Sequence, residues 1–158
     1  MAHFMYQREA TGHLQSQAAI QPQSDCSTTR SLLRGIRPNE LDLWWNRACE
    51  HLAAALEHAD DGTTLDEIKQ QILDGRSMLW MYGEQMSIVL SVENNRLYAW
   101  LIGGHSLDEW IDELIAAMRR YAKEHGMDGL QAVARPGLAR KLRRKGWKTT
   151  AEIIRTEL

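Results

Sequence analysis

The spacing of apolar residues along the chain predicts three long helices. In each, an apolar side chain returns every three or four positions, the period of one face of an α-helix. The three stretches are residues 38–59, 63–75 and 106–126. Asn39 is the predicted N-cap of the first. Thr64 and Glu67 fit a capping box at the start of the second, and Gly75 is its predicted C-cap.

Apolar runs of strand length alternate with these helices. They cover residues 30–37, 77–83, 84–94, 95–104 and 127–134. Turns at Gly83–Glu84 and Asn94–Asn95 predict that the three central runs form an antiparallel meander. A short basic helix at 135–146 and a final strand or strand pair at 147–158 complete the order β-α-α-β-β-β-α-β-α-β. We therefore expect an α/β (α+β) fold, a three-layer sandwich around a mixed, mostly antiparallel sheet.

The first 29 residues differ from the rest of the chain. They are rich in Gln, Ser, Thr and Ala and have no periodic apolar face, so they bury too little apolar surface to fold alone. We interpret residues 1–29 as an extended N-terminal tail that serves as an assembly arm, and residues 30–158 as one domain.

Composition excludes several classes of protein. The chain has 158 residues and a net charge of −2, so no global field points to nucleic acid or a membrane. Cys26 and Cys49 show no spacing typical of a disulfide framework or a zinc site. His51 and His58 could share a helix face, but without a third ligand we interpret them as surface residues and expect no metal. We expect neither a membrane span nor a secretory signal.

The order and lengths of these elements resemble the acyl-CoA N-acyltransferase (GNAT) superfamily over residues 30–158. The segment "RPGLARKLRRKGW" is similar to the late helix of that family, which ends in a Gly-aromatic pair, here Gly146–Trp147. Three features resemble the short GNAT-like proteins of tailed bacteriophages. They are Trp44–Trp45, Asp74–Gly75, and Arg135–Pro136–Gly137 leading to Trp147.

The resemblance implies that the coenzyme diphosphate would meet a loop and helix start, here in "LIGGHSLDEWIDELI". Backbone N–H groups and the positive end of the helix dipole can hold phosphate there. The residues concerned are Gly103, Gly104, His105, Ser106 and Leu107. However, Ser106 and Glu109 also fit a capping box, and Asp108 adds negative charge beside the dipole. The site is therefore either a phosphate cradle or, as these carboxylates favour, a self-capped helix start.

The resemblance also implies an acid that reprotonates the thiolate, often a Tyr of the late helix. Leu142 occupies that position, and a leucine cannot donate a proton. The candidates for a general base are Glu93 and Tyr98, although Glu93 beside Asn94–Asn95 is also typical of a solvated turn.

The late helix carries a local cluster of positive charge. It comprises Arg135, Arg140, Lys141, Arg143, Arg144, Lys145 and Lys148. These side chains could meet the 3′-phosphate of coenzyme A, contact DNA or an acidic protein, or form a solvated helix face.

The sequence leaves two functions open. The first is a phage-encoded GNAT-fold protein that is catalytically degenerate and acts as a binding or structural component of the virion. The second is an active N-acetyltransferase that uses acetyl-CoA. For the first we expect protein partners, other virion subunits or a second copy, bound through the N-terminal tail and exposed Trp such as Trp44 or Trp45. We expect the virion or the host cytoplasm as its location, and nucleic-acid binding only as a third alternative.

Overall fold

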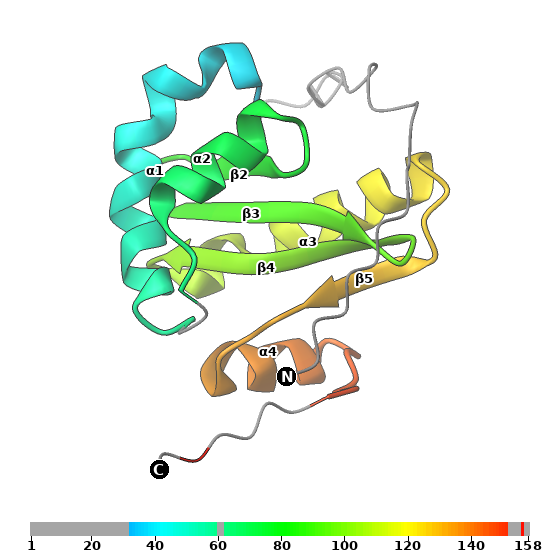
Figure 1. Cartoon of the computed structure of the whole chain (residues 1–158). Coiled ribbons are helices and arrows are strands. Elements are labelled where there is room, and N and C mark those ends of the chain that lie inside the picture. The colour runs from blue at the N-terminus through cyan, green and yellow to red at the C-terminus, as the bar shows by residue number, and fades with distance from the viewer. Residues whose placement is uncertain (1–31, 60–61, 152–155, 157–158) are drawn as a thin grey trace.

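The computed structural model describes residues 32–59, 62–151 and 156. The strands are β1 (Leu33–Ile36), β2 (Met78–Tyr82), β3 (Met86–Glu93), β4 (Arg96–Gly104) and β5 (Gly129–Ala132). The helices are α1 (Leu41–Leu56), α2 (Leu65–Leu73), α3 (Leu107–Glu124) and α4 (Pro136–Arg144), with a 3₁₀ turn η1 (Pro38–Glu40) before α1. Figure 1 shows α1 and α2 on one face of the sheet, α3 on the other, and α4 beyond β5. The predicted three-layer sandwich is confirmed.

The five described strands follow each other across one mixed sheet. Strands β1 to β4 pair antiparallel in sequence order, and β5 lies parallel to β4. The meander turn forms as predicted, because Asn94 and Asn95 adopt the left-handed conformation with φ of 48° and 58°. The predicted final strand at 147–158 does not begin by residue 151, and most of its remainder lies outside the described residues, as does the predicted tail.

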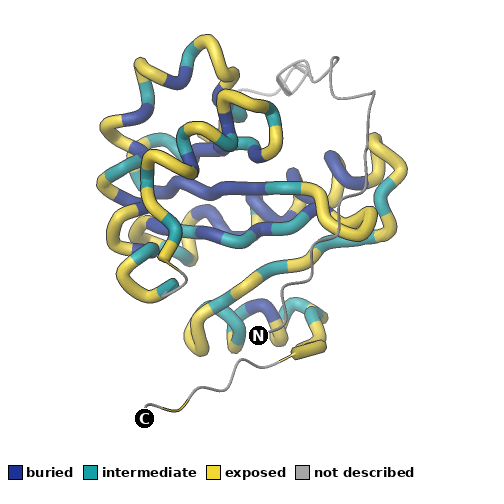
Figure 2. Tube along the Cα trace, viewed as in Figure 1, coloured by how far each residue is buried: buried dark blue, intermediate teal, exposed yellow. Residues whose placement is uncertain are grey.

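Alternating strand residues build a separate core on each face of the sheet. Leu79, Val89 and Leu101 point to the face that α1 and α2 cover. Trp80 and Ile88 point to the face that α3 covers. Figure 2 shows buried positions along the sheet and on the helices that cover it. Full burial of one such aliphatic side chain contributes about 1.5–3 kcal/mol, so both faces stabilise the sheet.

The predicted N-cap of the first helix is wrong. Asn39 lies inside the turn η1, and α1 begins only at Leu41 with no side-chain cap. Pro38 accounts for the difference, because its restricted φ suits the first position of a helical turn. The capping box of α2 is confirmed: the Thr64 hydroxyl accepts from the N–H of Glu67 at 3.2 Å, and the Glu67 carboxylate accepts from the N–H of Thr64 at 2.8 Å.

Two expectations of surface exposure fail in α1. Trp45 is only 8% exposed and belongs to the core under α1, while Trp44 is half-buried with the Arg34 guanidinium over its ring. His51 is also buried, and its Nδ1 lies 2.9 Å from the Oγ of the buried Ser87 on β3. The sequence pattern missed this polar contact, because Ser87 pairs with His51 only once the sheet has formed.

Burial lowers the pKa of the His51 imidazole below its ordinary value of 6.5. The nearby His105 and Arg47 add to this shift, whereas Glu50 and a hydrogen bond to the backbone of Glu84 oppose it. At a pH between the lowered pKa and 6.5, His51 therefore binds a proton in the unfolded chain but not in the folded chain.

We expect His51 to leave the free energy of unfolding unchanged above about pH 6.5. Below that pH the free energy of unfolding should fall, because the unfolded chain then binds a proton at His51 that the folded chain resists. Urea denaturation followed by Trp fluorescence, from about pH 7.5 down to about pH 5, measures this loss. His51→Gln, which cannot titrate, should lose this part of the pH dependence. His58→Gln changes an exposed histidine and is the control. An unchanged pH profile in His51→Gln would contradict the assignment.

Candidate functional site

Strands β4 and β5 part after a short paired segment. Their parallel pairing ends where Ala99 faces Ala132, and the N–H of Val133 still donates to the carbonyl of Ala99 at 3.0 Å. Beyond this point β4 continues to Gly104, while the chain after β5 turns away into α4. A β-bulge lies at the same place: Val89 faces Leu101 and Leu90 faces Ala99, so Trp100 is the extra residue. Such a bulge bends the strand and re-aims its side chains.

A cavity of about 640 Å³ opens where the strands part. Residues from α1 and the turn after it, from β4, from the chain after β5, from the start of α3 and from the length of α4 line it. They are Ala55, His58, Ala59, Trp100, Leu101, Ile102, Gly103, Gly104, Leu107, Trp110, Val133, Arg135, Gly137, Leu138, Arg140, Lys141 and Arg144. The cavity thus reaches past the sheet from the layer of α1 to α4, and its volume is typical of a small-molecule site.

One wall of the cavity is strongly cationic. Arg135, Arg140, Lys141 and Arg144 all line it from α4 and its N-cap. None of the lining residues is Asp or Glu. Four positive side chains on one wall favour an anionic ligand.

The start of α3 forms another part of the wall, and the predicted capping box there is wrong. Ser106 is the N-cap but has a left-handed backbone, with φ of 55°, and its side chain makes no capping hydrogen bond. Its Oγ lies instead 3.1 Å from Nδ1 of His105. The Glu109 carboxylate turns to Gln85, whose Nε2 donates to it at 2.7 Å. The first-turn amides are therefore not capped by the Ser106 side chain.

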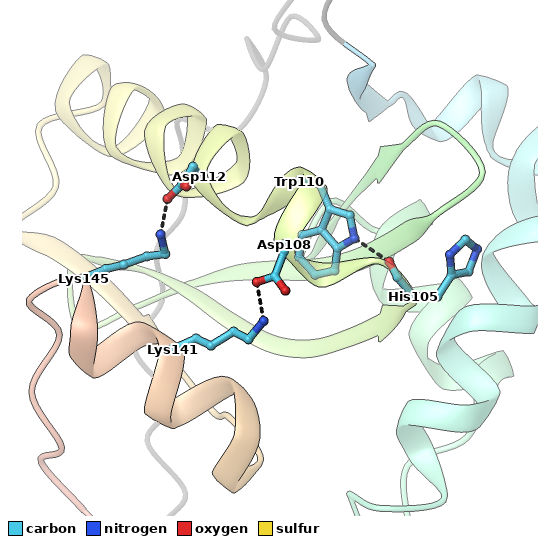
Figure 3. Close-up of polar contacts among 6 residues, drawn as sticks. All are labelled: His105, Asp108, Trp110, Asp112, Lys141 and Lys145. Atoms are coloured by element: carbon cyan, nitrogen blue, oxygen red, sulfur yellow. Dashed lines mark hydrogen bonds and ion pairs between the residues drawn. The ribbon is translucent and has the colours of Figure 1, made fainter.

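The turn before α3 is held in place by two other hydrogen bonds. The N–H of His105 donates to the carbonyl of Gln85 at 2.8 Å. The indole Nε1 of the buried Trp110 donates to the carbonyl of His105 at 2.7 Å, as Figure 3 shows. Because both bonds use the backbone of His105, the helix start keeps its position beside the cavity.

The two glycines of this turn are required by contacts within the protein itself. A Cβ on Gly103 would lie 2.0 Å from the carbonyl oxygen of His51 in α1. A Cβ on Gly104 would lie 2.1 Å from the carbonyl oxygen of Gln85, and Gly104 also has a φ of 138°. Their lack of side chains therefore lets β4 pack closely on α1 and on the turn before β3.

The acidic residues of α3 are paired with α4. The Asp108 carboxylate accepts from Lys141 Nζ, and the Asp112 carboxylate accepts from Lys145 Nζ. Figure 3 shows both lysines reaching from α4 towards α3. The negative charge beside the helix start is therefore offset by a cation on the neighbouring helix.

The predicted phosphate-binding turn and the predicted basic cluster each lie only partly in the cavity wall. Gly103, Gly104 and Leu107 line the cavity, whereas His105 and Ser106 do not. Four of the predicted basic residues line it, and three do not: Arg143, Lys145 and Lys148.

The candidates for proton transfer do not line the cavity. Glu93 is exposed at the far end of β3, opposite Arg96, and Tyr98 lies between Ser91 and Gln131 in the paired part of the sheet. Their catalytic role stays a prediction. Leu142 is 6% exposed and belongs to the core on the α3 face.

Trp100 and His58 are among the cavity residues that sequence reasoning missed. Trp100 looked like an ordinary strand residue, since no local signal marks the bulge that makes it the extra residue of β4. His58 follows the end of α1, and the sequence predicts it only as a surface histidine, although it lines the cavity.

Within the described ranges, no group of three or more His, Cys, Asp or Glu side chains could hold a metal ion. No helix in this part of the chain has both the length and the apolar character of a membrane span.

No protein-family model and no curated protein matches this chain. Solved structures do match its fold. A GCN5-related N-acetyltransferase from Ralstonia eutropha is 20% identical over 79% of this chain and 97% of its own, with a TM-score of 0.52. A ribosomal-protein-alanine N-acetyltransferase from Brucella melitensis is 15% identical over 78% and 99%, with a TM-score of 0.53. A predicted acetyltransferase from Clostridium acetobutylicum, solved with acetyl-CoA, is 8% identical over 79% and 94%, with a TM-score of 0.52.

We expect Gly103→Ala to destabilise the fold by about 2–4 kcal/mol, because its Cβ would overlap the α1 backbone. The free energy of unfolding from urea denaturation measures this. Gly137→Ala is the matched control, since a Cβ there meets nothing within 4 Å and alanine suits a helix better. Equal stabilities of the two variants would contradict the close approach of β4 to α1.

Proposed function

We propose that this chain, which has the fold of the GCN5-related N-acetyltransferases, binds acyl-coenzyme A in the cavity between β4 and α4. The single observation that carries the proposal is the cationic wall of that cavity, formed by Arg135, Arg140, Lys141 and Arg144. Coenzyme A carries a diphosphate and a 3′-phosphate, so several cations on one wall suit it better than they suit a neutral ligand.

The other walls suit the less polar part of such a ligand. Trp100, Leu107, Trp110 and Leu138 give an apolar lining, which favours a pantetheine arm or an acyl group. The helix start at Ser106 has no side-chain cap, which supports a contact between its amides and phosphate. Size, charge and lining together therefore fit acyl-coenzyme A.

The cavity supports binding more strongly than acyl transfer. When bound, the coenzyme would supply an acyl thioester, and its transfer to an amine needs groups that accept and return protons. Among the lining residues, His58 is the only histidine, the side chain that most often accepts and returns protons in catalysis. Leu142 is packed in the core, so the acid that the family resemblance implies has no counterpart there. We therefore propose a binding role with weak or no catalysis.

The second candidate is an active N-acetyltransferase. The position of His58 on the cavity wall favours it, because a histidine can carry the proton that the amine loses, either directly or through water. The solved structures of similar fold include enzymes that are named for acetylating an aminoglycoside or a ribosomal protein. For this chain we propose only the reaction class, transfer of an acyl group to an amine.

We also propose that the binding protein works within a phage assembly, as the sequence resemblance implies. We propose a contact with another protein at Leu43 on α1, whose side chain is 83% exposed. The contact would lie beside Trp44, and the N-terminal tail of residues 1–29 would be a further contact.

We expect calorimetric titration with acetyl-CoA to show binding that weakens as salt increases. Arg140→Ala and Arg144→Ala should each weaken it about fivefold to twentyfold, because each removes one phosphate-facing charge. Arg143→Ala is the matched control, since Arg143 is on the same helix but does not line the cavity.

Two results would contradict this proposal. One is the absence of a calorimetric binding signal with both acetyl-CoA and coenzyme A at low salt. The other is equal weakening by all three arginine variants. Acetyl transfer to amines well above the uncatalysed rate, and its loss in His58→Gln, would replace the binding role with the second candidate.

A further inference from the structure

Two ion pairs connect α3 and α4 in the same register. Asp108 and Asp112 lie four residues apart on α3, and their partners Lys141 and Lys145 lie four residues apart on α4. Residues at this spacing lie on one face of a helix, so the pairs are successive rungs between the two helices (Figure 3). We call the Lys141–Asp108 pair the inner rung and the Lys145–Asp112 pair the outer rung.

Only the inner rung has a member in the cavity wall. Lys141 lines the cavity, whereas Asp108, Lys145 and Asp112 do not. Asp108 lies in the first turn of α3, two residues after the uncapped Ser106. The inner rung therefore places a protein carboxylate on a cation that an anionic ligand would also contact.

A carboxylate and a phosphate compete for one ammonium group. Lys141 presents a compact positive charge on a flexible stem, and whichever anion lies nearer gains most of the attraction. The Asp108 carboxylate also repels a phosphate placed at the start of α3. Both effects act against a ligand, and both disappear if Asp108 loses its charge.

We propose that Asp108 is an internal competitor of the ligand phosphate: it pairs with Lys141 and thereby sets the affinity and charge selectivity of the cavity. This inference rests on the proposed binding of acyl-coenzyme A. Asp108 acts through Lys141 and is a specificity-determining residue, not a catalytic one. The outer rung continues to hold α4 beside α3 when the ligand displaces Asp108 from Lys141.

The test compares Asp108→Asn with Asp112→Asn. Each variant removes one carboxylate from the same face of α3 and breaks one ion pair with α4. The exposed fractions of the two carboxylate side chains, 84% and 78%, are similar, so the cost to stability should be small and alike. The two variants therefore differ mainly in whether the lost carboxylate competes at the cavity.

The measurement is calorimetric titration of the folded full chain with coenzyme A at low salt, repeated with inorganic diphosphate. We expect Asp108→Asn to bind coenzyme A about threefold to tenfold more tightly than the unsubstituted chain. Asp112→Asn should change the affinity by less than about twofold. The gain in Asp108→Asn should shrink as salt is added, and Lys141→Ala combined with Asp108→Asn should remove most of it.

The outcomes separate the inference about Asp108 from the proposed binding of acyl-coenzyme A. Equal binding of coenzyme A by the unsubstituted chain and Asp108→Asn, or an equal gain in Asp112→Asn, overturns the inference while leaving the proposed function intact. Binding of diphosphate but not of coenzyme A, again tighter in Asp108→Asn, supports the inference and overturns the proposed function. If neither ligand binds any of the variants, both are overturned.

Discussion

The parting of β4 from β5 is the constraint on which the site depends. Parallel pairing stops at Ala99 and Ala132, and the bulge at Trp100 bends β4 at the same point. Beyond the bulge β4 stays paired with β3, and Gly103 also comes close to the α1 backbone. An opening can therefore persist between two packed layers without the sheet falling apart, and the cavity occupies that opening.

Helix α4 gives this opening its chemical character. It follows β5 after a short turn, which brings Arg140, Lys141 and Arg144 to the cavity. Its apolar residue Leu142 packs into the core on the α3 face, which fixes the side of the helix that lines the cavity. The same geometry sets Lys141 against Asp108 of α3. Lys141 thus both lines the cavity and forms the ion pair with α3.

Two capping boxes predicted from the same local motif, at Thr64 and at Ser106, differ in the structure. At Thr64 the box forms, because the chain before α2 is extended and the hydroxyl reaches the N–H of Glu67. At Ser106 it does not, because the turn is bound through the His105 backbone to Gln85 and Trp110, and Ser106 adopts a left-handed conformation. Distant contacts therefore overrode a local signal of the same kind.

The sequence by itself determined the type and order of the elements as far as α4, because apolar periodicity and turn residues act within a few positions of each other. It also showed the positive charge of the late helix. The tertiary structure alone decided that His51 is buried against Ser87, that Trp100 faces a cavity, and that Asp108 meets Lys141, which is 33 residues away along the chain. Such contacts depend on how the layers pack and on where the strands part, and the spacing of residues along the chain does not encode either feature.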